Sequence, residues 1–237
     1  MANIEKTMKT IGLVGGMSWE STLEYYRVMN QYTKERLGGF HSAKIVLYSV
    51  DFAEVESRQH EGRWDDLTRL MIHAAQRVER AGAELLVICT NTMHKMADDV
   101  QRQIRIPILH IVDVTAAEII RRSMRKVGLL GTRFTMEQDF YKQRLIRDHG
   151  LEVIIPDEKE REDIHNILYN ELCLGEIKEP SKRTFRAIIA SLESRGAQGI
   201  ILGCTEIPLL VSQEDYKIPL FDTTTLHARA AVDFALE

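Results

Sequence analysis

Cysteine followed by threonine ends an apolar run twice in this chain. Residues 87–95 read VICTNTMHK and residues 201–208 read ILGCTEIP, so Cys89 and Cys204 each stand where an apolar run gives way to small hydrogen-bonding residues. A free cysteine is often a small buried hydrophobe, which is the simplest interpretation of either residue by itself. Because the same pair recurs at the same point, we expect both thiols to take part in chemistry.

Several kinds of chemistry use two cysteines. A zinc site favours closely spaced pairs such as C-x₂-C, and a thiol redox pair favours C-x-x-C, but the chain has neither spacing. A cysteine nucleophile paired with histidine needs one cysteine. Two thiols on opposite sides of one carbon atom suit a reaction in which one removes a proton and the other delivers one. A helix that begins after each cysteine would favour the thiolate through its free N–H groups.

Alternating apolar and amphipathic segments must position these thiols. Strands are predicted at 9–16, 43–52, 83–89, 106–113, 126–132, 151–156, 199–204 and 218–222. Helices are predicted from Ser18 or Ser21 to Gly38, at 65–81, from 89 toward 104, from a capping box at 135–138 to 150, around 160–174, around 181–195 and from 223. Apolar strands that alternate with helices predict parallel sheets.

The second half of the chain repeats the first. IGLVGG at 11–16 corresponds to VGLLGT at 127–132, VICT to LGCT, and IPILHI to IPLFDT, each about 115 residues apart. The repeat predicts an α/β protein with two pseudo-symmetric, doubly wound, parallel-sheet domains: residues 1–115 with 223–237, and residues 116–222. Because ligands bind beyond the carboxyl ends of such strands, we expect the active site between the two domains.

Composition narrows the classes of function. The 237 residues are 44% hydrophobic and 28% charged, which is typical of a globular protein. The formal net charge of −4 gives no basic footprint for nucleic acid, and no apolar run approaches the roughly 20 residues of a membrane span. The stretch MANIEKTMKTIGL has no long apolar region and no small-residue cleavage site, so we do not expect secretion, and three cysteines do not suit a disulfide framework. We expect a cytoplasmic protein that acts on a small molecule. A homodimer is one possible assembly.

Five segments carry a family resemblance. GLVGGMSWEST, CTNTMHK, GLLGTRFTMEQDFY, NELCLGEI and GCTEI together resemble the PLP-independent aspartate/glutamate racemase family, and within it the bacterial broad-specificity amino-acid racemases. The resemblance covers nearly the whole chain. It implies a substrate bound between two α/β domains, no cofactor, no metal, and Cys89 and Cys204 as the two bases. Family members with threonine in place of the first cysteine are one-directional, so keeping both favours reversible interconversion of L- and D-amino acids.

Polar residues beside the cysteines are the expected substrate-binding residues. Those that match family positions for the α-carboxylate and α-amino group are Thr90, Asn91, Thr92 and Thr205. Hydroxyl, amide and backbone N–H groups at a helix start suit a carboxylate, although the same residues could serve as N-caps. The residues expected to line the cleft from the first strand of each half are Met17, Ser18, Thr132 and Thr135. Glu206 is expected to hold the ammonium group, with a surface acid as the alternative.

The pocket for the substrate side chain departs from the family pattern. Members specific for dicarboxylates are expected to place basic residues there, but one such position aligns with Cys173 and the second strand ends in Asp51. Neutral or longer amino acids are therefore alternative substrates to aspartate and glutamate. Asn166 and Tyr169 are expected to shape this end of the pocket. The alternatives are a hydantoin racemase, a maleate-isomerase-like enzyme, or a non-catalytic amino-acid-binding protein.

Overall fold

The computed structural model describes residues 8–237, which divide into two compact units. The first unit contains the chain up to Cys89, residues 96–110 and residues 227–237. The second contains residues 90–95 and 111–226. The limits expected from the sequence, at 115 and 223, lie a few residues from these. The expectation for residues 1–7 lies outside the described residues.

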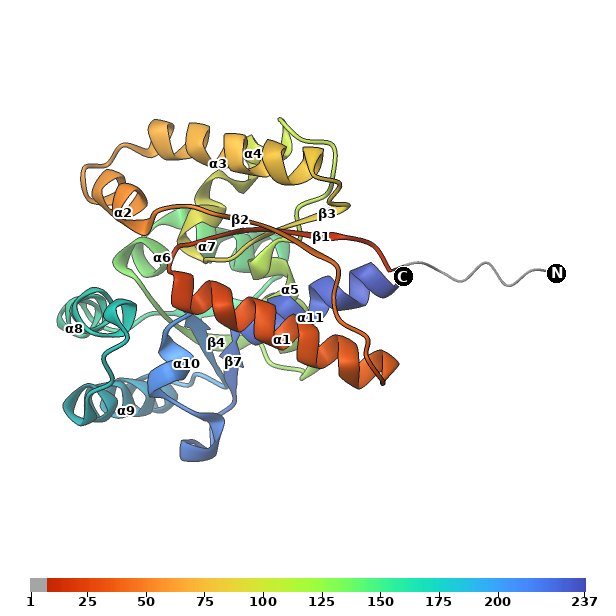
Figure 1. The fold of residues 1–237 in the computed structure, drawn as a ribbon. Coiled ribbons are helices and arrows are strands. Elements are labelled where there is room, and N and C mark those ends of the chain that lie inside the picture. Colours follow the sequence, from red (N-terminus) through yellow and green to blue (C-terminus); the bar gives the residue numbers. More distant parts are fainter. Residues whose placement is uncertain (1–7) are drawn as a thin grey trace. The chain divides into compact units, whose positions relative to one another are not determined.

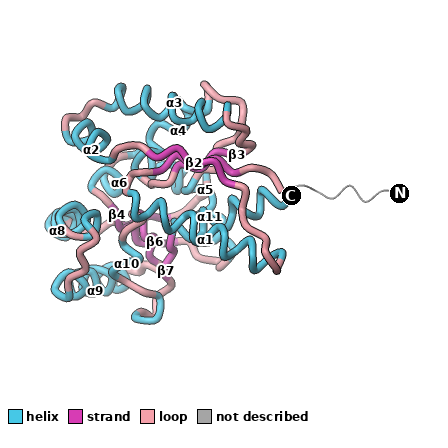
Figure 2. Tube along the Cα trace, viewed as in Figure 1, coloured by secondary structure: helices cyan, strands magenta, loops and turns pink. Residues whose placement is uncertain are grey.

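The first unit is built on a parallel sheet with strand order β2-β1-β3 (Figures 1 and 2). Its elements are β1 (Ile11–Gly15), α1 (Trp19–Leu37), β2 (Ile45–Ser49), α2 (Phe52–His60), α3 (Trp64–Arg80), β3 (Leu85–Ile88) and α4 (Ala97–Gln101). Successive strand residues point to opposite faces. A Cβ at Gly12 would lie 2.1 Å from Val78 of α3, and one at Gly15 would lie 2.5 Å from Thr22 of α1. Helices α3 and α1 therefore cover opposite faces of this sheet.

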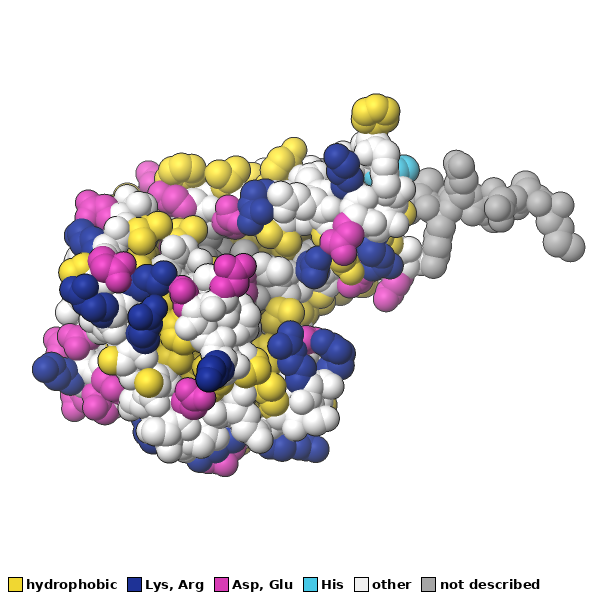
Figure 3. Space-filling model, turned by 90° about the horizontal axis from the view of Figure 1, so that it is seen from below, with side chains coloured by type: hydrophobic (Ala, Val, Ile, Leu, Met, Phe, Trp, Pro, Cys, Tyr) yellow, Lys and Arg dark blue, Asp and Glu magenta, His cyan; other side chains and the backbone are white. Residues whose placement is uncertain are grey.

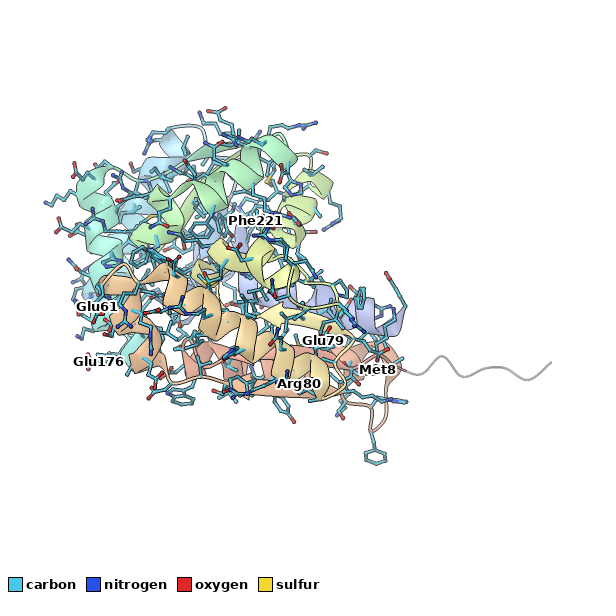
Figure 4. All side chains as sticks on the ribbon, turned by 90° about the horizontal axis from the view of Figure 1, so that it is seen from above. Met8, Glu61, Glu79, Arg80, Glu176 and Phe221 are labelled. Atoms are coloured by element: carbon cyan, nitrogen blue, oxygen red, sulfur yellow. The ribbon has the colours of Figure 1, made fainter. Side chains whose placement is uncertain are left out.

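The second unit is built on a parallel sheet with strand order β5-β4-β6-β7. Its strands are β4 (Lys126–Gly131), β5 (Glu152–Ile154), β6 (Ile200–Gly203) and β7 (Leu220–Asp222). Its helices are α5 (Ile111–Arg121), α6 (Arg133–Glu137), α7 (Asp139–Gln143), the π-helix η2 (Arg144–Asp148), α8 (Glu158–Asn170), the 3₁₀ helices η3 (Leu172–Leu174) and η4 (Gln213–Asp215), α9 (Glu179–Ser194) and α10 (Ile207–Leu210). Phe221 of β7, labelled in Figure 4, is 1% exposed in the core of this unit.

Two helices carry residues of both units. The 3₁₀ helix η1 spans Thr92–Met96, and α11 spans Thr223–Leu236. The core of the first unit takes its α11 residues from one face, namely Ala228, Ala231, Val232 and Ala235. These small side chains recur at helical spacing, so one face of α11 packs with β1 and β3.

The α/β fold with parallel sheets is confirmed, and the internal repeat is visible in its hydrogen bonds. Leu86 N donates to the Pro107 carbonyl at 2.8 Å, and Ile200 N donates to the Pro219 carbonyl at 2.8 Å. The corresponding apolar segments of the two halves thus pair with equivalent strands, although Leu86 lies three residues before Cys89 and Ile200 lies four residues before Cys204.

The strand predicted at 106–113 is wrong. Leu86 and Ile108 form one isolated bridge, and α5 begins at Ile111. Glu79, labelled in Figure 4 near the end of α3, accepts the backbone N–H groups of Arg105 and Ile106 at 2.6 and 3.1 Å. This side chain holds the segment beside β3 without extending the ladder.

Three further expectations need correction. The strand predicted at 43–52 is shorter, because β2 ends at Ser49 and helix α2 begins at Phe52. The predicted capping box at 135–138 does not form, because Thr132 caps α6 by accepting from Thr135 N. The long helix predicted toward 104 is instead the 3₁₀ helix η1 followed by the short α4.

Candidate active site

The expected site residues lie just beyond the carboxyl ends of the strands. In the first unit Met17 and Ser18 follow β1, Asp51 follows β2 and Cys89 follows β3. In the second unit Thr132 follows β4 and Cys204 follows β6. Parallel strands bring their carboxyl ends to one edge of a sheet, so each unit gathers its own set of these residues.

The turn after β1 is fixed by its backbone. Gly16 has φ +86°, and a Cβ there would lie 2.2 Å from the Val50 carbonyl oxygen. Gly16 N donates to Thr22 Oγ1 at 2.8 Å, and the Thr22 hydroxyl donates to the Ser18 carbonyl at 2.8 Å. Ser18 is the N-cap of α1, accepting from Ser21 N. Met17 and Ser18 are therefore buried in a defined turn, at 4% and 1% exposure.

Asp51 has a structural use in the first unit. It is the N-cap of α2, and its Oδ1 accepts from Ala53 N at 3.1 Å. The side chain is exposed. A capping carboxylate stabilises the start of a helix, so Asp51 does not need a ligand to explain its position.

Cys89 is fully buried at the end of β3. Its backbone N donates to the Val14 carbonyl at 2.9 Å, and its side chain belongs to the apolar core cluster of the first unit. Burial raises the pKa of the Cys89 thiol. The expectation that a helix start favours the thiolate is not supported, because a 3₁₀ helix follows Cys89 and only the four-residue α10 follows Cys204.

Asn91 presents an open amide oxygen. Its Nδ2 donates to Thr223 Oγ1 at 3.1 Å, and the Thr223 hydroxyl donates to the Leu202 carbonyl at 2.8 Å. Because the hydroxyl proton is used on Leu202, Thr223 can only accept from Asn91, which fixes the orientation of the amide. Within residues 8–237, Asn91 Oδ1 is buried without a hydrogen-bond partner. This oxygen can accept a hydrogen bond from an N–H group of a ligand.

His94 supports the turn that holds Asn91. Its Nδ1 lies 2.8 Å from the Thr90 carbonyl oxygen, and its Nε2 lies 3.3 Å from Ile111 N. Since Ile111 N–H must donate, Nε2 accepts and Nδ1 carries the proton, which describes a neutral imidazole. His94 is 3% exposed, so it is a buried support for the turn.

Three threonine hydroxyls form a chain in the second unit. Thr92 Oγ1 lies 3.3 Å from Thr132 Oγ1, which lies 3.2 Å from Thr135 Oγ1. All three residues are buried. The chain joins the turn after β3 to the turn after β4, so the structure brings these predicted binding residues together.

Cys204, Thr205 and Glu206 form a compact polar group after β6. The Cys204 thiol and the Thr205 hydroxyl each donate to Glu206 Oε2 at 2.9 Å. Glu206 is 3% exposed, so it is not the surface acid that was the alternative. Burial, and then the charge of Glu206, raise the pKa of the Cys204 thiol well above its usual value. Cys173 of η3 contributes to the same rise in this pKa.

Asn166 and Tyr169 have different surroundings on α8. Tyr169 packs against the core of the second unit, and its ring centroid lies 4.7 Å from that of His165. Asn166 lines a cavity of about 330 Å³ whose lining comes from α8, Glu171 and α9. The residues of this lining are Asp163, Asn166, Ile167, Asn170, Glu171, Pro180, Ser181 and Thr184. The lining holds none of the predicted strand-end residues.

Two residues of this region were missed in the sequence. Thr223 orients Asn91, and Thr224 is 3% exposed with a buried hydroxyl that has no partner within residues 8–237. Both follow β7 directly. The signal was present in IPLFDTTT, where hydroxyl residues follow an apolar strand just as they do after Cys89 and Cys204.

Residues 8–237 contain neither a cluster of metal ligands nor a helix suited to a membrane. No group of three or more His, Cys, Asp or Glu side chains is arranged to hold a metal ion. No helix in this part of the chain is both long and apolar enough to cross a membrane. On the face drawn in Figure 3, basic and acidic side chains are interspersed.

Comparison with known proteins gives consistent matches. The family model described as Asp/Glu/Hydantoin racemase matches residues 14–231. The broad specificity amino-acid racemase RacX of Bacillus subtilis is 25% identical over 229 residues, which cover 94% of this chain and 96% of RacX. A candidate Asp/Glu racemase from Yersinia pestis has a TM-score of 0.90 and 55% identity, with 97% of this chain and 100% of that chain covered. An aspartate racemase homologue from Pyrococcus horikoshii has a TM-score of 0.84 and 40% identity, with coverages of 97% and 100%.

Proposed function

Because the chain belongs to the Asp/Glu/hydantoin racemase family, we propose that it is an amino-acid racemase that uses two cysteines and no PLP or metal. The observation that carries the proposal is the repeated strand end. Cys89 follows β3 and Cys204 follows β6, the corresponding strands of two parallel sheets, and a threonine follows each cysteine. A packing role would not require the same pair in both halves.

The proposed reaction moves one proton off Cα and another onto it. One thiolate takes the Cα proton, which breaks the C–H bond and leaves a carbanion. The thiol on the other side of Cα then delivers its proton, so the configuration is inverted and the two cysteines exchange protonation states. Burial raises the pKa of both thiols, so both carry their protons at neutral pH and one of them must lose its proton before it can act as the base.

The α-amino and α-carboxylate groups have proposed partners. Asn91 Oδ1, buried and without a partner among the described residues, is proposed to accept from the amino group. The groups proposed to bind the carboxylate are the hydroxyls of Thr92 and Thr132 and the backbone N–H of Thr205, because the Thr205 hydroxyl donates its proton to Glu206. Hydroxyls can donate to a carboxylate without adding charge to the site.

We propose a broad substrate range rather than aspartate alone. Asp51 is spent on capping α2, and Cys173 supplies a thiol where dicarboxylate-specific members are expected to place a base. Helix η3, which carries Cys173, lies beside α10, and Cys173 acts electrostatically on Cys204. At least one uncharged or basic amino acid should turn over with a kcat/KM at least equal to that for aspartate. Values confined to aspartate and glutamate would contradict this range.

One assay tests the function and its alternatives. Each amino acid of a panel is incubated in D₂O without added cofactor, with and without EDTA, and scored for chirality and Cα deuterium. A racemase inverts and deuterates its substrate. A hydantoin or maleate substrate that reacts while all amino acids do not would favour the related enzymes, and binding without deuteration would favour a binding protein.

We also propose that the protein acts in the cytoplasm as a homodimer. Cys89, Cys173 and Cys204 are free thiols, which suit a reducing compartment. Helix α1 exposes Trp19, Leu23 and Tyr26 at 65%, 54% and 52%, on positions that share one helix face. Aromatic side chains are enriched in the cores of interfaces between protein chains, so this exposed face of α1 is the proposed contact between two copies.

The dimer is tested by its mass in solution. Leu23→Asp should shift the sedimenting species from dimer to monomer. In an isologous contact both copies carry the substitution, so two charged side chains would enter the same interface. Leu174→Asp is the matched control, since Leu174 is 67% exposed on η3 of the second unit. A monomeric wild-type protein at micromolar concentration would contradict the assembly.

A further inference from the structure

Cys89 and Cys204 have different hydrogen-bond acceptors beside their thiols. Cys204 Sγ lies 2.9 Å from Glu206 Oε2, which also accepts from Thr205 Oγ1 at 2.9 Å. For Cys89, the acceptor near the thiol is the backbone carbonyl of Val87 at 4.0 Å. A carboxylate beside a thiol is a base that can take the thiol proton by direct transfer, and a backbone carbonyl is not such a base. The second unit therefore contains an acid–base pair that has no counterpart at Cys89 among these contacts.

Burial decides how this pair can ionise. Cys204 and Glu206 are 8% and 3% exposed. Loss of the thiol proton to solvent would leave a thiolate and a carboxylate side by side in a buried position, which is costly. Transfer of the proton from Sγ to Oε2 breaks the S–H bond, forms an O–H bond and leaves the charge of the pair unchanged. A thiolate is then available without the second negative charge.

Building on the proposed function, we propose that Glu206 is the proton partner of Cys204 and acts on the thiol rather than on the substrate. When Cys204 is the base, Glu206 first takes its proton, and the thiolate then removes the proton from Cα. After Cys89 has delivered its proton to the other side, Glu206 releases its proton to solvent and Cys89 takes one up. The reverse reaction runs the same steps backwards, so protons balance in both directions.

Other groups near the pair do not offer the same exchange. Thr205 donates to Glu206 and keeps its proton, because a hydroxyl does not ionise at neutral pH. Cys173, from η3, acts on Cys204 through charge. Among residues 8–237, the polar side chains with which Cys204 interacts are Glu206 and Cys173, and of these two Glu206 is the carboxylate.

The test measures the alkylation of Cys204 by iodoacetamide in the full chain, without substrate, from about pH 5 to pH 10. Peptide mass spectrometry reads Cys89, Cys173 and Cys204 separately. Only the thiolate reacts. In the wild-type protein, Cys204 and Glu206 share one proton across part of this pH range. The fraction of Cys204 thiolate is then constant, so the alkylation rate of Cys204 should not change with pH there. In Glu206→Gln the rate should rise about tenfold per pH unit until the thiol ionises.

Racemisation gives the second measurement. Glu206→Gln should lower the rate at neutral pH by about 10²-fold, and the rate should recover as the pH rises, which lost packing would not produce. Glu206→Asp keeps a carboxylate and should retain the level alkylation region. A wild-type Cys204 profile without a level region would overturn the proposal, even if Glu206→Gln failed to fold. An inactive wild-type protein would instead count against racemase function, and the alkylation profiles would still decide the role of Glu206.

Discussion

Cys89→Ser and Cys204→Ser are each expected to lower the rate of racemisation by about 10²-fold to 10⁴-fold, the range that a general acid or base contributes. Serine nearly preserves the shape of cysteine, and both thiols are buried at strand ends where shape matters. A neutral hydroxyl is a far weaker base than a thiolate at neutral pH. The measurement is the change in chirality with time, using a substrate identified by the amino-acid panel.

Deuterium exchange shows which thiol has been lost. The two enantiomers have equal free energies, so any variant must lower kcat/KM equally in both directions, and the ratio of these values carries no information. Each thiol should, however, still exchange the Cα proton that it faces. Cys89→Ser and Cys204→Ser should therefore retain slow Cα-deuterium exchange on opposite enantiomers.

A third cysteine provides the comparison. Cys173→Ser removes a thiol that has no proposed proton-transfer role, so both enantiomers should continue to exchange, even if substrate preference changes. Full racemase activity in either Cys89→Ser or Cys204→Ser would refute the two-base mechanism. Exchange of the same enantiomer by both variants would show that the thiols do not act from opposite sides of Cα.

The parts of the fold that were predicted correctly depend on local patterns. Ser18 and Gly38 bound α1 as expected, because an N-cap hydroxyl and a C-terminal glycine act on their own helix. The ends of β3 and β6 were also located correctly, because the apolar run that ends in Cys-Thr is a local pattern in the sequence. Parallel sheets followed from strands without a polar face, such as the fully buried β1.

The strand that was predicted wrongly depends on a distant contact. The segment at 106–113 resembles a strand, but the N–H of Ile111 lies 3.3 Å from His94 Nε2, and α5 begins there. A partner so far back in the chain leaves no local signal. The cap that the Asp51 carboxylate forms on α2 is a local contact, and it was not predicted because helix α2 itself was not predicted. The contact between Cys204 and Glu206 is local, but it was not predicted because it crosses a tight turn after β6, where neither helical nor strand periodicity applies.

Asn91 is the residue whose contribution to substrate binding should be largest after the cysteines. Its amide orientation is fixed by Thr223, and its oxygen is buried and open. A hydrogen bond to a charged partner contributes about 1.5–3 kcal/mol, which corresponds to roughly 10-fold to 150-fold in affinity. Since the amino group is bound before and during proton transfer, the loss should appear mainly as a higher KM.

Asn91→Ala is therefore expected to lower kcat/KM by about 10²-fold, mainly through KM, in steady-state assays with the best amino acid of the panel. Thr223→Val keeps the amide but removes the hydroxyl that orients it, so we expect a loss of about 10-fold, the lower end of that range. Thr223→Ser retains the hydroxyl and is the matched control, with kcat/KM close to that of the wild-type protein.

Thermal unfolding of each variant separates a binding effect from a loss of stability. An unchanged KM in folded Asn91→Ala would show that its open oxygen does not receive the amino group. A Thr223→Ser variant as impaired as Thr223→Val would show that the methyl group of Thr223, rather than its hydroxyl, supports Asn91.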